Sequence, residues 1–542
     1  MAKALKIRDL TLRDGQQSLF ATRLRNESIR RLLPLYRKAG FYIMEVWGGA
    51  VPDAMMRYLD ESPWDRLRLC SEELKGVSLL AGLSRGRNLL GYLPYPSYVL
   101  DTFYQEAIKN GLEVVRIYDS LNDLDNLRDS VDMINALGGI PDTAICYTID
   151  PKEEPAPEPK KKGFFARLFG GDNDDEELPQ KVFTDDYFVK KAKDMEAMGA
   201  GILTLKDMTG LIRPSRIYTL MPKLKHAVDI PVDFHTHSTP GYGLGAVLTA
   251  ILKGVDIVDT NIWWFAGGAA APAIELVWLF CKKLDLKIDV DMDAVAEIRR
   301  ELKSIREELA DFDMNRDRLP HDFDEWYAKM PPEIDAEFDR AIQAASDNDD
   351  PALMKACWKI EDYFGFPAPD RKMRKAEIPD STYSNIVTHL RSLKEEDLLG
   401  ETLELVGKVR KDAGLPPLVT PIGHIIGTQA AAIAIDRKKG LPDYTTLNNQ
   451  FVALVKGEYG HTPSEIDPSF REYITGNPEE TAYDTTSFRE PPNPELPEYG
   501  GVKLARNDEE YLLLEMLPSV ASVFLKKRRA NEYKDGMQSP LE

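Results

Sequence analysis

Short runs of β-branched and other apolar residues alternate with longer amphipathic segments along roughly the first 285 residues of the chain. In the longer segments apolar positions recur every three or four residues, which indicates helices with one buried face. Strands that alternate with helices in this way are typical of repeated βα units and a parallel sheet. The predicted strands are residues 6–12, 42–47, 77–83, 114–118, 143–149, 202–206, 232–237 and 257–262.

Several of the intervening helices end at a glycine, the residue that most readily adopts the left-handed conformation of a helix C-terminus. These glycines are Gly40, Gly111, Gly138 and Gly254. Eight strands within about 280 residues fit a closed (β/α)8 TIM barrel. No G-x-G-x-x-G sequence follows the first strand, as an open dinucleotide-binding sheet would require. The sequence therefore predicts an α/β fold with a TIM barrel over residues 1–288.

The character of the chain changes after the barrel. Residues 289–542 contain long charged helical patterns and proline-punctuated segments, without a repeat of fixed period. We therefore expect a second, mostly helical C-terminal domain over 289–542, with a strongly helical stretch at 507–529.

A charged insertion interrupts the barrel pattern after the fifth strand, over residues 151–182. Its mixture of proline, charge and an apolar, basic centre is typical of a flexible loop. Because loops that follow barrel strands emerge at the catalytic face, we expect the insertion beside the active site. It is either a tolerated surface loop or a docking element for another subunit or an anionic membrane surface. The docking residues would be Lys160, Lys161, Lys162, Phe164, Phe165, Arg167, Leu168 and Phe169.

The charge and the cysteine content of the chain limit the classes of binding partner and the cellular compartment that we expect. With 89 acidic against 69 basic residues the formal net charge is −20, which repels phosphate backbones and argues against nucleic acid as a partner. The cysteines Cys70, Cys146, Cys281 and Cys357 form no C-x-x-C pair, so neither a disulfide framework nor a thiolate zinc site is indicated. Since no apolar run reaches about 18 residues and no signal-like segment begins the chain, we expect a cytoplasmic protein.

A His-x-His pair stands at the end of the seventh predicted strand, in the sequence DFHTHS. Residues i and i+2 of a strand share a face, so His235 and His237 can converge on one metal ion. Asp14 ends the first strand and Lys206 ends the sixth, which places all four residues at the catalytic face of a barrel. The alternative is that one imidazole is an ordinary hydrogen-bonded core group.

A lysine beside a metal site needs an explanation, because an ammonium group repels a cation. Burial and a nearby ion would lower the pKa of Lys206, and a neutral amine can add CO₂ to form a carbamate that ligates through oxygen. This hypothesis makes Asp14, Lys206, His235 and His237 a metal-ligand set. The alternative is an ion pair of Lys206 with Asp207 or Asp14.

Two turns at the catalytic face carry further polar residues. The third strand is followed by SRGRNLLGYLPYP, which contains Arg85 and Tyr92, and the first-strand turn offers Arg13, Gln16 and Gln17. An arginine that faces the pocket can hold a substrate carboxylate through two hydrogen bonds, although an ordinary surface ion pair is an equal alternative.

Six segments together resemble the family of biotin-dependent carboxyltransferases. They are TLRDGQQSLFATRLR, MEVWGGAVPDAMMRYLDESPWDRLR, SRGRNLLGY, LTLKDMTGLIRP, DFHTHSTPGYG and VTPIGHIIGTQA. The family includes the carboxyltransferase domain of pyruvate carboxylase, the alpha subunit of oxaloacetate decarboxylase and the pyruvate-side subunit of transcarboxylase. The likeness covers most of residues 5–470 outside the insertion.

The resemblance implies a divalent ion, commonly zinc but cobalt or manganese in some members, and a set of functional residues. The implied metal ligands are Asp14, carbamylated Lys206, His235 and His237. The implied pyruvate- and biotin-binding residues are Gln17, Asp53, Arg85 and Tyr92. In PDSTYSN, Ser384 takes the place of a hydroxyl that shuttles a proton between biotin and the enol.

The implied reaction moves a carboxyl group between carboxybiotin and a 2-oxo acid, with pyruvate and oxaloacetate as the expected pair. In that reaction Lys206, Ser384 and Arg85 are the expected catalytic residues, and Arg85 and the metal stabilise the developing enolate oxygen.

The sequence departs from the family in two segments that flank the pocket. The family's double glycine is replaced by Asp380 and Ser381, and its G-G-T-S-Q-P segment reads GGAAAP at residues 267–272, just after Trp263 and Trp264. Because these segments flank the pocket, the sequence defines the identity of the acceptor acid less well than it defines the carboxyl-transfer reaction. No [AV]-M-K-M sequence lies near the chain end, so we expect biotin on a separate biotin carboxyl carrier protein, and by resemblance a homodimer within a larger complex.

Other functions remain open at this point. They are a subunit like the alpha chain of a sodium-pumping oxaloacetate decarboxylase, a lyase of the hydroxymethylglutaryl-CoA lyase class, a metal-dependent amidohydrolase and a non-catalytic scaffold. The position of Lys206 on the sixth strand argues against the lyase, and the position of His-x-His on the seventh strand argues against the amidohydrolase.

Overall fold

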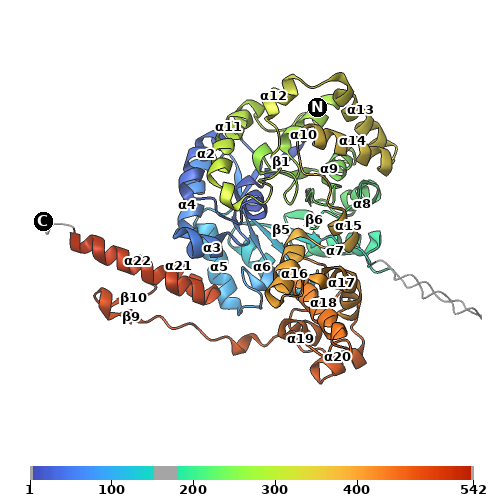
Figure 1. The fold of residues 1–542 in the computed structure, drawn as a ribbon. Coiled ribbons are helices and arrows are strands. Elements are labelled where there is room, and N and C mark those ends of the chain that lie inside the picture. The colour runs from blue at the N-terminus through green and yellow to red at the C-terminus, as the bar shows by residue number, and fades with distance from the viewer. Residues whose placement is uncertain (1–3, 152–180, 539–542) are drawn as a thin grey trace, which may run out of the picture.

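The computed structural model describes residues 4–151 and 181–538. Its centre is a closed barrel of eight parallel strands in sequence order, in which β8 pairs with β1 (Figure 1). The predicted TIM barrel is therefore confirmed. The strands are β1 (Lys6–Asp9), β2 (Ile43–Gly48), β3 (Leu79–Ser84), β4 (Val114–Tyr118), β5 (Ile140–Cys146), β6 (Ile202–Asp207), β7 (Val232–Thr236) and β8 (Ile257–Thr260).

Amphipathic helices form the outer layer of the barrel. In α2, for example, Ile29, Leu32 and Tyr36 lie on the buried face. The four predicted C-terminal glycines all have positive φ, which confirms their role as helix ends. The helices of this layer are α1 (Gln16–Leu19), α2 (Asn26–Ala39), α3 (Val51–Ala54), α4 (Pro63–Leu74), α5 (Ser97–Lys109), α6 (Asp125–Ala136), α7 (Asp185–Met198), α8 (Pro214–Ala227), α9 (Gly243–Leu252) and α10 (Ile274–Lys283).

The fifth strand differs from its predicted range. It begins at Ile140 rather than at residue 143, because Pro141 and Asp142 also belong to it. Both residues are uncommon in strands, so local propensity argues against them. Asp142 is nevertheless stabilised there, since its carboxylate pairs with Arg8 at 2.5 Å and with Arg116 at 2.9 Å inside the barrel.

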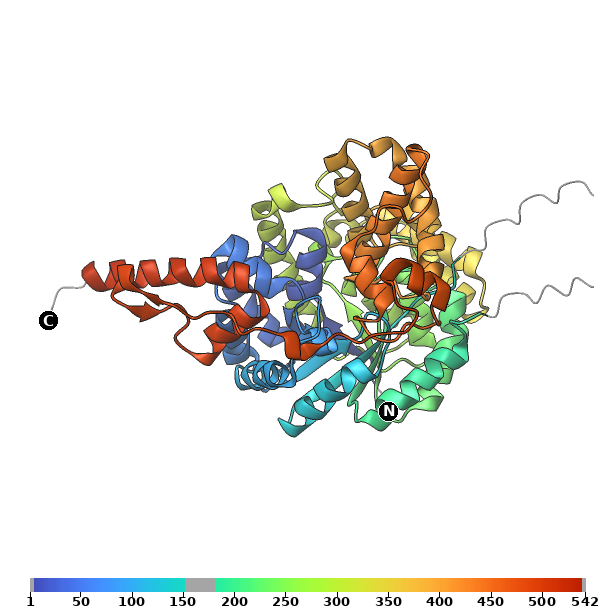
Figure 2. The ribbon, with the colours of Figure 1, turned by 90° about the horizontal axis from the view of Figure 1, so that it is seen from below.

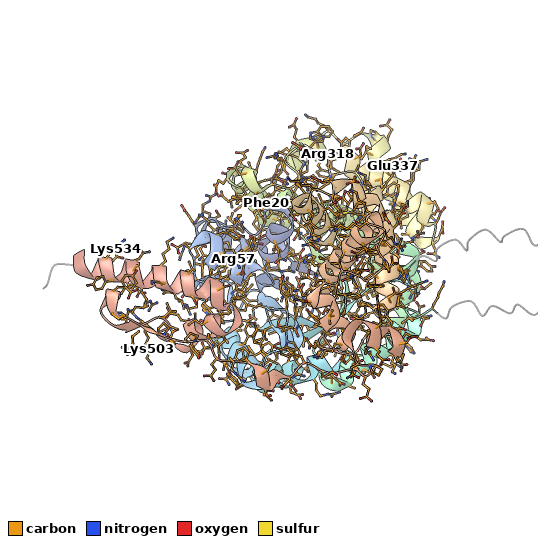
Figure 3. All side chains as sticks on the ribbon, turned by 60° about the horizontal axis from the view of Figure 1, so that its bottom comes forward. Phe20, Arg57, Arg318, Glu337, Lys503 and Lys534 are labelled. Carbon is orange, nitrogen blue, oxygen red and sulfur yellow. The ribbon has the colours of Figure 1, made fainter. Side chains whose placement is uncertain are left out.

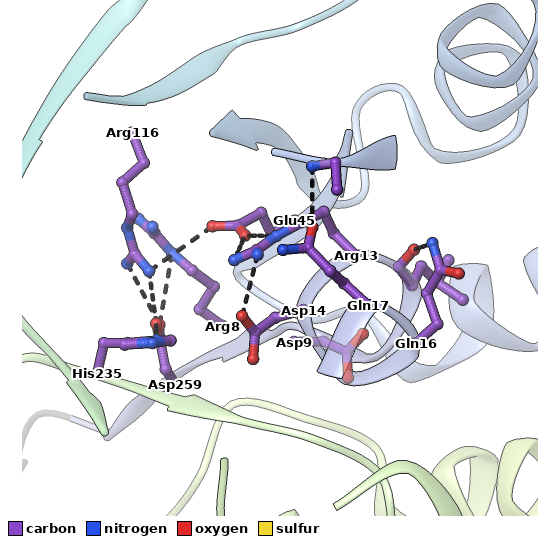
Figure 4. A network of polar contacts seen from close by, with 12 residues as sticks. Arg8, Asp9, Arg13, Asp14, Gln16, Gln17, Glu45, Arg116, His235 and Asp259 are labelled. Atoms are coloured by element: carbon purple, nitrogen blue, oxygen red, sulfur yellow. Dashed lines mark hydrogen bonds and ion pairs between the residues drawn. The ribbon is translucent and has the colours of Figure 1, made fainter. Parts of the chain in front are cut away.

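The interior of the barrel is a network of charged side chains (Figure 4). The Arg116 guanidinium lies 2.6 Å from Asp259 and 2.7 Å from Asp233, and Arg8 lies 3.2 Å from Asp233. All members of the network are fully buried; they are Arg8, Glu45, Arg116, Asp142, Asp233 and Asp259. Because isolated charges are very costly to bury, Asp142, Asp233 and Asp259 depend on these two arginines, whereas Glu45 pairs with Arg13.

The C-terminal region packs in three parts. Helices α11 (Met292–Glu308), α12 (Phe323–Ala328), α13 (Pro332–Ser346) and α14 (Asp350–Tyr363) share one hydrophobic core with the barrel. A second core is formed mainly by residues 378–474. Its helices, with α15 leading into them, are α15 (Arg371–Ala376), α16 (Asp380–Leu393), α17 (Leu399–Asp412), α18 (Ile422–Lys438), α19 (Asn449–Lys456) and α20 (Pro468–Thr475).

The third part returns to the barrel core and ends in an arm that projects from the body (Figures 1 and 2). It comprises β9 (Glu495–Leu496), β10 (Val502–Lys503), α21 (Asp508–Met516) and α22 (Pro518–Gln538). The helical stretch expected at 507–529 is thus two helices, because Pro518 lacks the backbone N–H that would continue α21. The division of the chain into domains at residue 288 stays a prediction.

The second core lies over the carboxyl ends of the barrel strands. The Tyr118 hydroxyl at the end of β4 donates to the Thr420 carbonyl at 3.3 Å. Val419 packs against Leu83, Tyr118 and Cys146 at this end of the barrel. The segment just before α18 therefore closes part of the barrel mouth. In the described part of the chain, no helix is long and apolar enough to cross a membrane.

The charged interior predicts a large effect of Arg116→Met on stability. Removing this cation leaves Arg8 as the one arginine of the described residues that still contacts Asp142, Asp233 and Asp259. Breaking such buried pairs costs about 3–5 kcal/mol. Urea unfolding followed by circular dichroism measures the change. Lys329→Ala is the control, because Lys329 and Glu325 are 65% and 56% exposed and such surface pairs contribute about 0–1 kcal/mol. Equal losses in both variants would contradict the assignment.

Candidate metal centre and active site

Three predicted ligands meet at the carboxyl end of the barrel. Asp14 lies in the helical turn Thr11–Gly15 that follows β1, His235 lies in β7, and His237 follows the end of β7. One ligand atom of each residue lies within 4.8 Å of those of the other two. His237 Nε2 and Asp14 Oδ2 are 3.3 Å apart. All three side chains are buried.

The donor atoms of this cluster have unused hydrogen-bonding capacity. His235 Nε2, His237 Nε2 and Asp14 Oδ2 are buried without a hydrogen-bond partner among the described residues. Buried polar atoms are rarely left in this state unless an ion or water completes them. Two imidazoles and one carboxylate are ligands that zinc and similar divalent ions accept. The residues present therefore fit a divalent cation.

The pKa shifts of Asp14 and His235 favour the deprotonated forms that bind a metal ion. Although burial alone would raise it, the pKa of Asp14 is held well below its usual value by Arg13 and His237. Burial, and then the charge of Lys206, lower the pKa of His235 well below its usual value. The carboxylate is thus ionised and the His235 ring is neutral at physiological pH, as metal ligands must be.

Lys206 lies beside the cluster and is almost fully buried. It is paired with His235 in the register of β6 and β7 and is 1% exposed. The ion pairs of the described residues do not include Lys206, whereas Asp14 pairs with Arg13. Burial lowers the pKa of Lys206, and Arg116 and Arg13 lower it further. These surroundings favour a neutral amine, which is the form that reacts with CO₂.

The sequence did not reveal which residue orients His235. Its Nδ1 lies 2.7 Å from Asp259 Oδ2, and Asp259 is in turn held by Arg116 at 2.6 Å (Figure 4). Arg116 and the His235 contact lower the pKa of Asp259, against the effect of burial. A carboxylate at Nδ1 fixes the tautomer, so that the Nε2 lone pair faces the cluster. In the sequence, only the position of Asp259 within the predicted strand 257–262 signals this role.

The residues expected to bind substrate lie on neighbouring loops. Arg85 donates through Nη1 to the carbonyls of Leu90 and Gly91, at 2.8 and 3.0 Å, and through Nε to the Tyr118 hydroxyl at 3.1 Å. These bonds tie the guanidinium to its own loop and leave Nη2 for a ligand. The Tyr92 ring centre lies 5.5 Å from the Arg85 guanidinium, and this tyrosine is 48% exposed.

Gln17 and Asp53 occupy the first two loops of the catalytic face. The Gln17 side-chain carbonyl accepts a hydrogen bond from the Ala50 backbone N–H at 3.0 Å (Figure 4), which connects these loops. Asp53 is half-buried and forms an ion pair with Arg57 at 2.8 Å. The structure thus brings Gln17 to the loop that carries Asp53, but it pairs Asp53 with its own helix neighbour.

Ser384 keeps its predicted role only as a prediction, because no described contact links it to the cluster. It lies exposed in α16, and no hydrogen bond within the described chain links it to Asp14, His235 or His237. A residue that the sequence reasoning missed lies nearer the barrel mouth. His424, at the start of α18, is mostly buried, its Nε2 has no partner among the described residues, and its pKa is lowered by burial and by Arg85. Its place within VTPIGHIIGTQA was the available signal.

The altered loop at residues 267–272 also lies next to the cluster. The Ser238 backbone N–H, adjacent to His237, donates to the Ala270 carbonyl at 3.1 Å. The neighbouring Trp263 belongs to the hydrophobic core, where it packs against Phe323 and Phe366. The expected docking residues of the insertion lie outside the described residues.

Comparisons with known proteins support a carboxylase relationship along the chain. A family model described as "Conserved carboxylase domain" matches residues 374–541, and an "HMGL-like" model matches residues 180–302. A pyruvate carboxylase subunit of Methanocaldococcus jannaschii is 31% identical over 96% of this chain and 78% of its own. The 2-oxoglutarate carboxylase large subunit of Hydrogenobacter thermophilus is 30% identical over 98% of this chain and 69% of its own.

A third relative and the solved structures agree with these matches. The methylmalonyl-CoA carboxyltransferase 5S subunit of Propionibacterium freudenreichii subsp. shermanii is 28% identical over 96% of this chain and 87% of its own. The carboxyl transferase domain of Rhizobium etli pyruvate carboxylase superposes with a TM-score of 0.74 at 25% identity, over 98% of this chain and 78% of that one. A structure of the same domain with pyruvate and biocytin has the same TM-score and identity.

The contact between Asp259 and His235 generates a test. We expect Asp259→Asn to weaken zinc binding about 10- to 100-fold, because the His235 ring loses the carboxylate that fixes its tautomer. Competition with a chromogenic chelator measures the affinity.

Asp233→Asn is the matched control, since Asp233 is equally buried and contacts Arg8 and Arg116, but no ion pair among the described residues links it to the cluster. Burial and the nearby Asp259 raise the pKa of Asp233 to about 8, so the neutral amide resembles its native state. An equal loss of affinity in both variants would mean that general damage to the barrel, and not the orientation of His235, is responsible.

Proposed function

This chain belongs to the family of biotin-dependent carboxyltransferases, and from that premise we propose that its acceptor acid is pyruvate, which it converts to and from oxaloacetate. As a family member it moves a carboxyl group between biotin and a 2-oxo acid. The observation that supports the reaction is the buried group of Asp14, His235 and His237 beside Lys206 at the carboxyl end of a closed barrel. The pairing of Arg13 with Asp14 and Glu45 supports pyruvate as the acceptor.

The proposed metal is zinc, with cobalt or manganese as alternatives. Asp14, His235 and His237 would hold it directly, and Lys206 would join them after its neutral amine adds CO₂ and releases a proton, which forms a carbamate. When bound, the ion acts as a Lewis acid that favours the enolate form of the 2-oxo acid. The free lone pairs of the two imidazoles support this ligand set.

The polar residues of the surrounding loops would position the reactants. Arg85, through Nη2, and Gln17 would hold the carboxylate of the 2-oxo acid. Tyr92 and Asp53 belong to the residues that the resemblance implies for holding pyruvate or biotin. Arg85 would also stabilise the developing enolate oxygen, a preorganised charge that removes several kcal/mol from a barrier.

The proton transfer is assigned to Ser384 by resemblance alone. Its hydroxyl would accept the proton that leaves the pyruvate methyl group and pass a proton to the biotin nitrogen from which CO₂ departs. The enolate then forms a carbon–carbon bond to that CO₂ and gives oxaloacetate. Because Ser384 lies exposed in α16, this role requires the reactants to reach the surface of that helix.

We place the enzyme in a multisubunit complex. Biotin would arrive on a separate biotin carboxyl carrier protein, and two copies of this chain would form a homodimer. The insertion over residues 151–182 would contact an additional subunit or a membrane surface. Four free, buried cysteines are compatible with a reducing compartment, and we propose the cytoplasm.

The name of one relative makes 2-oxoglutarate an alternative acceptor acid. The Hydrogenobacter thermophilus protein is named for 2-oxoglutarate, and this chain differs from the family at residues 267–272, beside His237. An acceptor with a second carboxylate needs a second free cation in the pocket. Arg13, the buried arginine next to Asp14, is already paired with Asp14 and Glu45. Three arginines of the catalytic face that have no ion pair among the described residues, Arg213, Arg371 and Arg374, line a separate hollow whose wall includes none of the three candidate metal ligands. The pairing of Arg13 therefore favours pyruvate.

We expect Lys206→Ala to lose both its metal and its activity. Wild type should contain about one divalent ion per chain by elemental analysis, and should decarboxylate oxaloacetate in the presence of free biotin. Lys191→Ala is the control, because Lys191 is also a partly buried lysine with a pKa lowered by burial, but donates to the Asn122 carbonyl. A Lys206→Ala protein that keeps its full metal content would overturn the carbamate, and a metal-free wild type would overturn the site.

The acceptor is tested by comparing products in the carboxylation direction. With carboxylated biotin as donor, we expect kcat/KM for pyruvate to exceed that for 2-oxoglutarate by about 100-fold or more, since an unpaired buried carboxylate costs several kcal/mol. Mass spectrometry distinguishes oxaloacetate from oxalosuccinate. A preference for 2-oxoglutarate would reverse the assignment without changing the reaction class.

A further inference from the structure

Three arginines line a hollow at the catalytic face of the barrel. Arg213 follows β6, whereas Arg371 and Arg374 belong to α15. The hollow has a volume of about 280 Å³, and its wall also contains Ile149, Leu211 and Tyr242 from the loops after β5, β6 and β7. We call Arg213, Arg371 and Arg374 the basic rim. Since loops after barrel strands surround the active site, the basic rim lies beside the barrel mouth.

The basic rim is unusual because, within residues 4–151 and 181–538, no carboxylate neutralises its three guanidinium groups. The formal net charge of the chain is −20, yet no carboxylate oxygen of the described residues forms an ion pair within 4.0 Å with any of the three guanidinium groups. Lys375 and Glu377, which also line the hollow, cancel each other in formal charge. The arginines inside the barrel behave differently, since Arg8, Arg13 and Arg116 all pair with buried carboxylates.

Two of these cations share one aromatic ring. The guanidinium carbons of Arg213 and Arg374 lie 5.7 and 5.9 Å from the Tyr242 ring centre, and Arg374 also lies 5.5 Å from the ring of Trp358. Aromatic faces attract each cation but do not cancel their mutual repulsion. An acidic partner at this place would relieve that repulsion.

The helix α15 of the basic rim is attached to the loop after β7, which carries His237. Asp370 caps α15, since its carboxylate accepts hydrogen bonds from the backbone N–H groups of Lys372 and Met373, at 2.7 and 3.0 Å. The Asp370 backbone N–H donates to the Thr239 carbonyl at 2.8 Å, two residues beyond His237. The arginines are therefore presented on a defined surface close to the site.

We propose that the basic rim docks an acidic face of the biotin carrier protein when that protein brings biotin to the barrel mouth. The proposal rests on the proposed function, because it takes the carrier as the macromolecule that must approach this face. The rest of a chain with net charge −20 repels an acidic protein, so local cations would steer the carrier to the mouth and speed its association.

The test compares biotin on its carrier with free biotin. The double variant Arg371→Glu/Arg374→Glu should raise KM for the biotinylated carrier protein, purified from the source organism on monomeric avidin, by about 10-fold or more at low salt. Its kcat/KM with free biotin in oxaloacetate decarboxylation should stay within about twofold of wild type, because the wall of the hollow includes neither the candidate metal ligands nor Arg85. Raising the salt concentration should weaken carrier binding in wild type more than in the variant.

The matched control is Lys503→Glu/Lys534→Glu, which changes the net charge equally on the projecting arm (Figure 3). This control should leave KM for the carrier unchanged. Thermal unfolding of both variants checks that the fold is retained. The proposal is overturned if the rim variant leaves KM for the carrier unchanged, or if its reaction with free biotin falls in parallel, which would assign the rim to a small anionic substrate.

Carrier binding is also measured without catalysis, by biolayer interferometry of the immobilised carrier at two salt concentrations. Salt-sensitive binding that depends on Arg371 and Arg374 supports the docking surface even if the chain is inactive toward oxaloacetate. Loss of activity with binding retained would count against the proposed function alone, and absent or rim-independent binding would count against the docking surface.

Discussion

Charge balance inside the barrel is the constraint on which the rest of this structure depends. Two buried arginines, Arg8 and Arg116, contact the side-chain carboxyl groups of Asp142 in β5, Asp233 in β7 and Asp259 in β8. Such a network lies beside an apolar layer formed by Ile43, Ala81, Val114, Ile202 and Ile257. It is stable only when every charge has a partner. The network includes Asp259, which contacts His235. The ion pairs inside the barrel therefore also orient a candidate metal ligand.

The charges of this network also set the pKa values of the candidate metal ligands. Arg13 stands between Asp14 and Glu45, so one guanidinium keeps Asp14 ionised and also ties the first loop to β2 (Figure 4). Arg116 and Arg13 lower the pKa of Lys206 after burial has done so. A lysine whose pKa is lowered by burial and nearby arginines, beside an ionised aspartate and a neutral histidine, is an arrangement suited to carbamate formation and to cation binding.

The C-terminal helices add a second level of control over access. Their separate core, built mainly from residues 378–474, places Thr420 and His424 at the barrel mouth and α15 next to the loop after β7. Two different surfaces therefore border the mouth. On α18 lies the mostly buried His424, and on α15 lie Arg371 and Arg374, which have no carboxylate partner among the described residues. Under the proposals made above, this asymmetry would give an acidic carrier protein a preferred direction of approach, whereas a small 2-oxo acid would bind at the loop of Arg85.

The sequence by itself determined the barrel, the glycine helix ends and the convergence of Asp14, His235 and His237, because each follows from local periodicity or from the common edge of parallel strands. Tertiary structure alone decided the start of β5 at Ile140, the bond of Asp259 to His235 and the exposure of Ser384. It also committed two Arg85 nitrogens to Leu90, Gly91 and Tyr118. The physical reason is that burial and partner choice depend on side chains brought together from distant strands, as when Arg8 makes Asp142 acceptable in a strand.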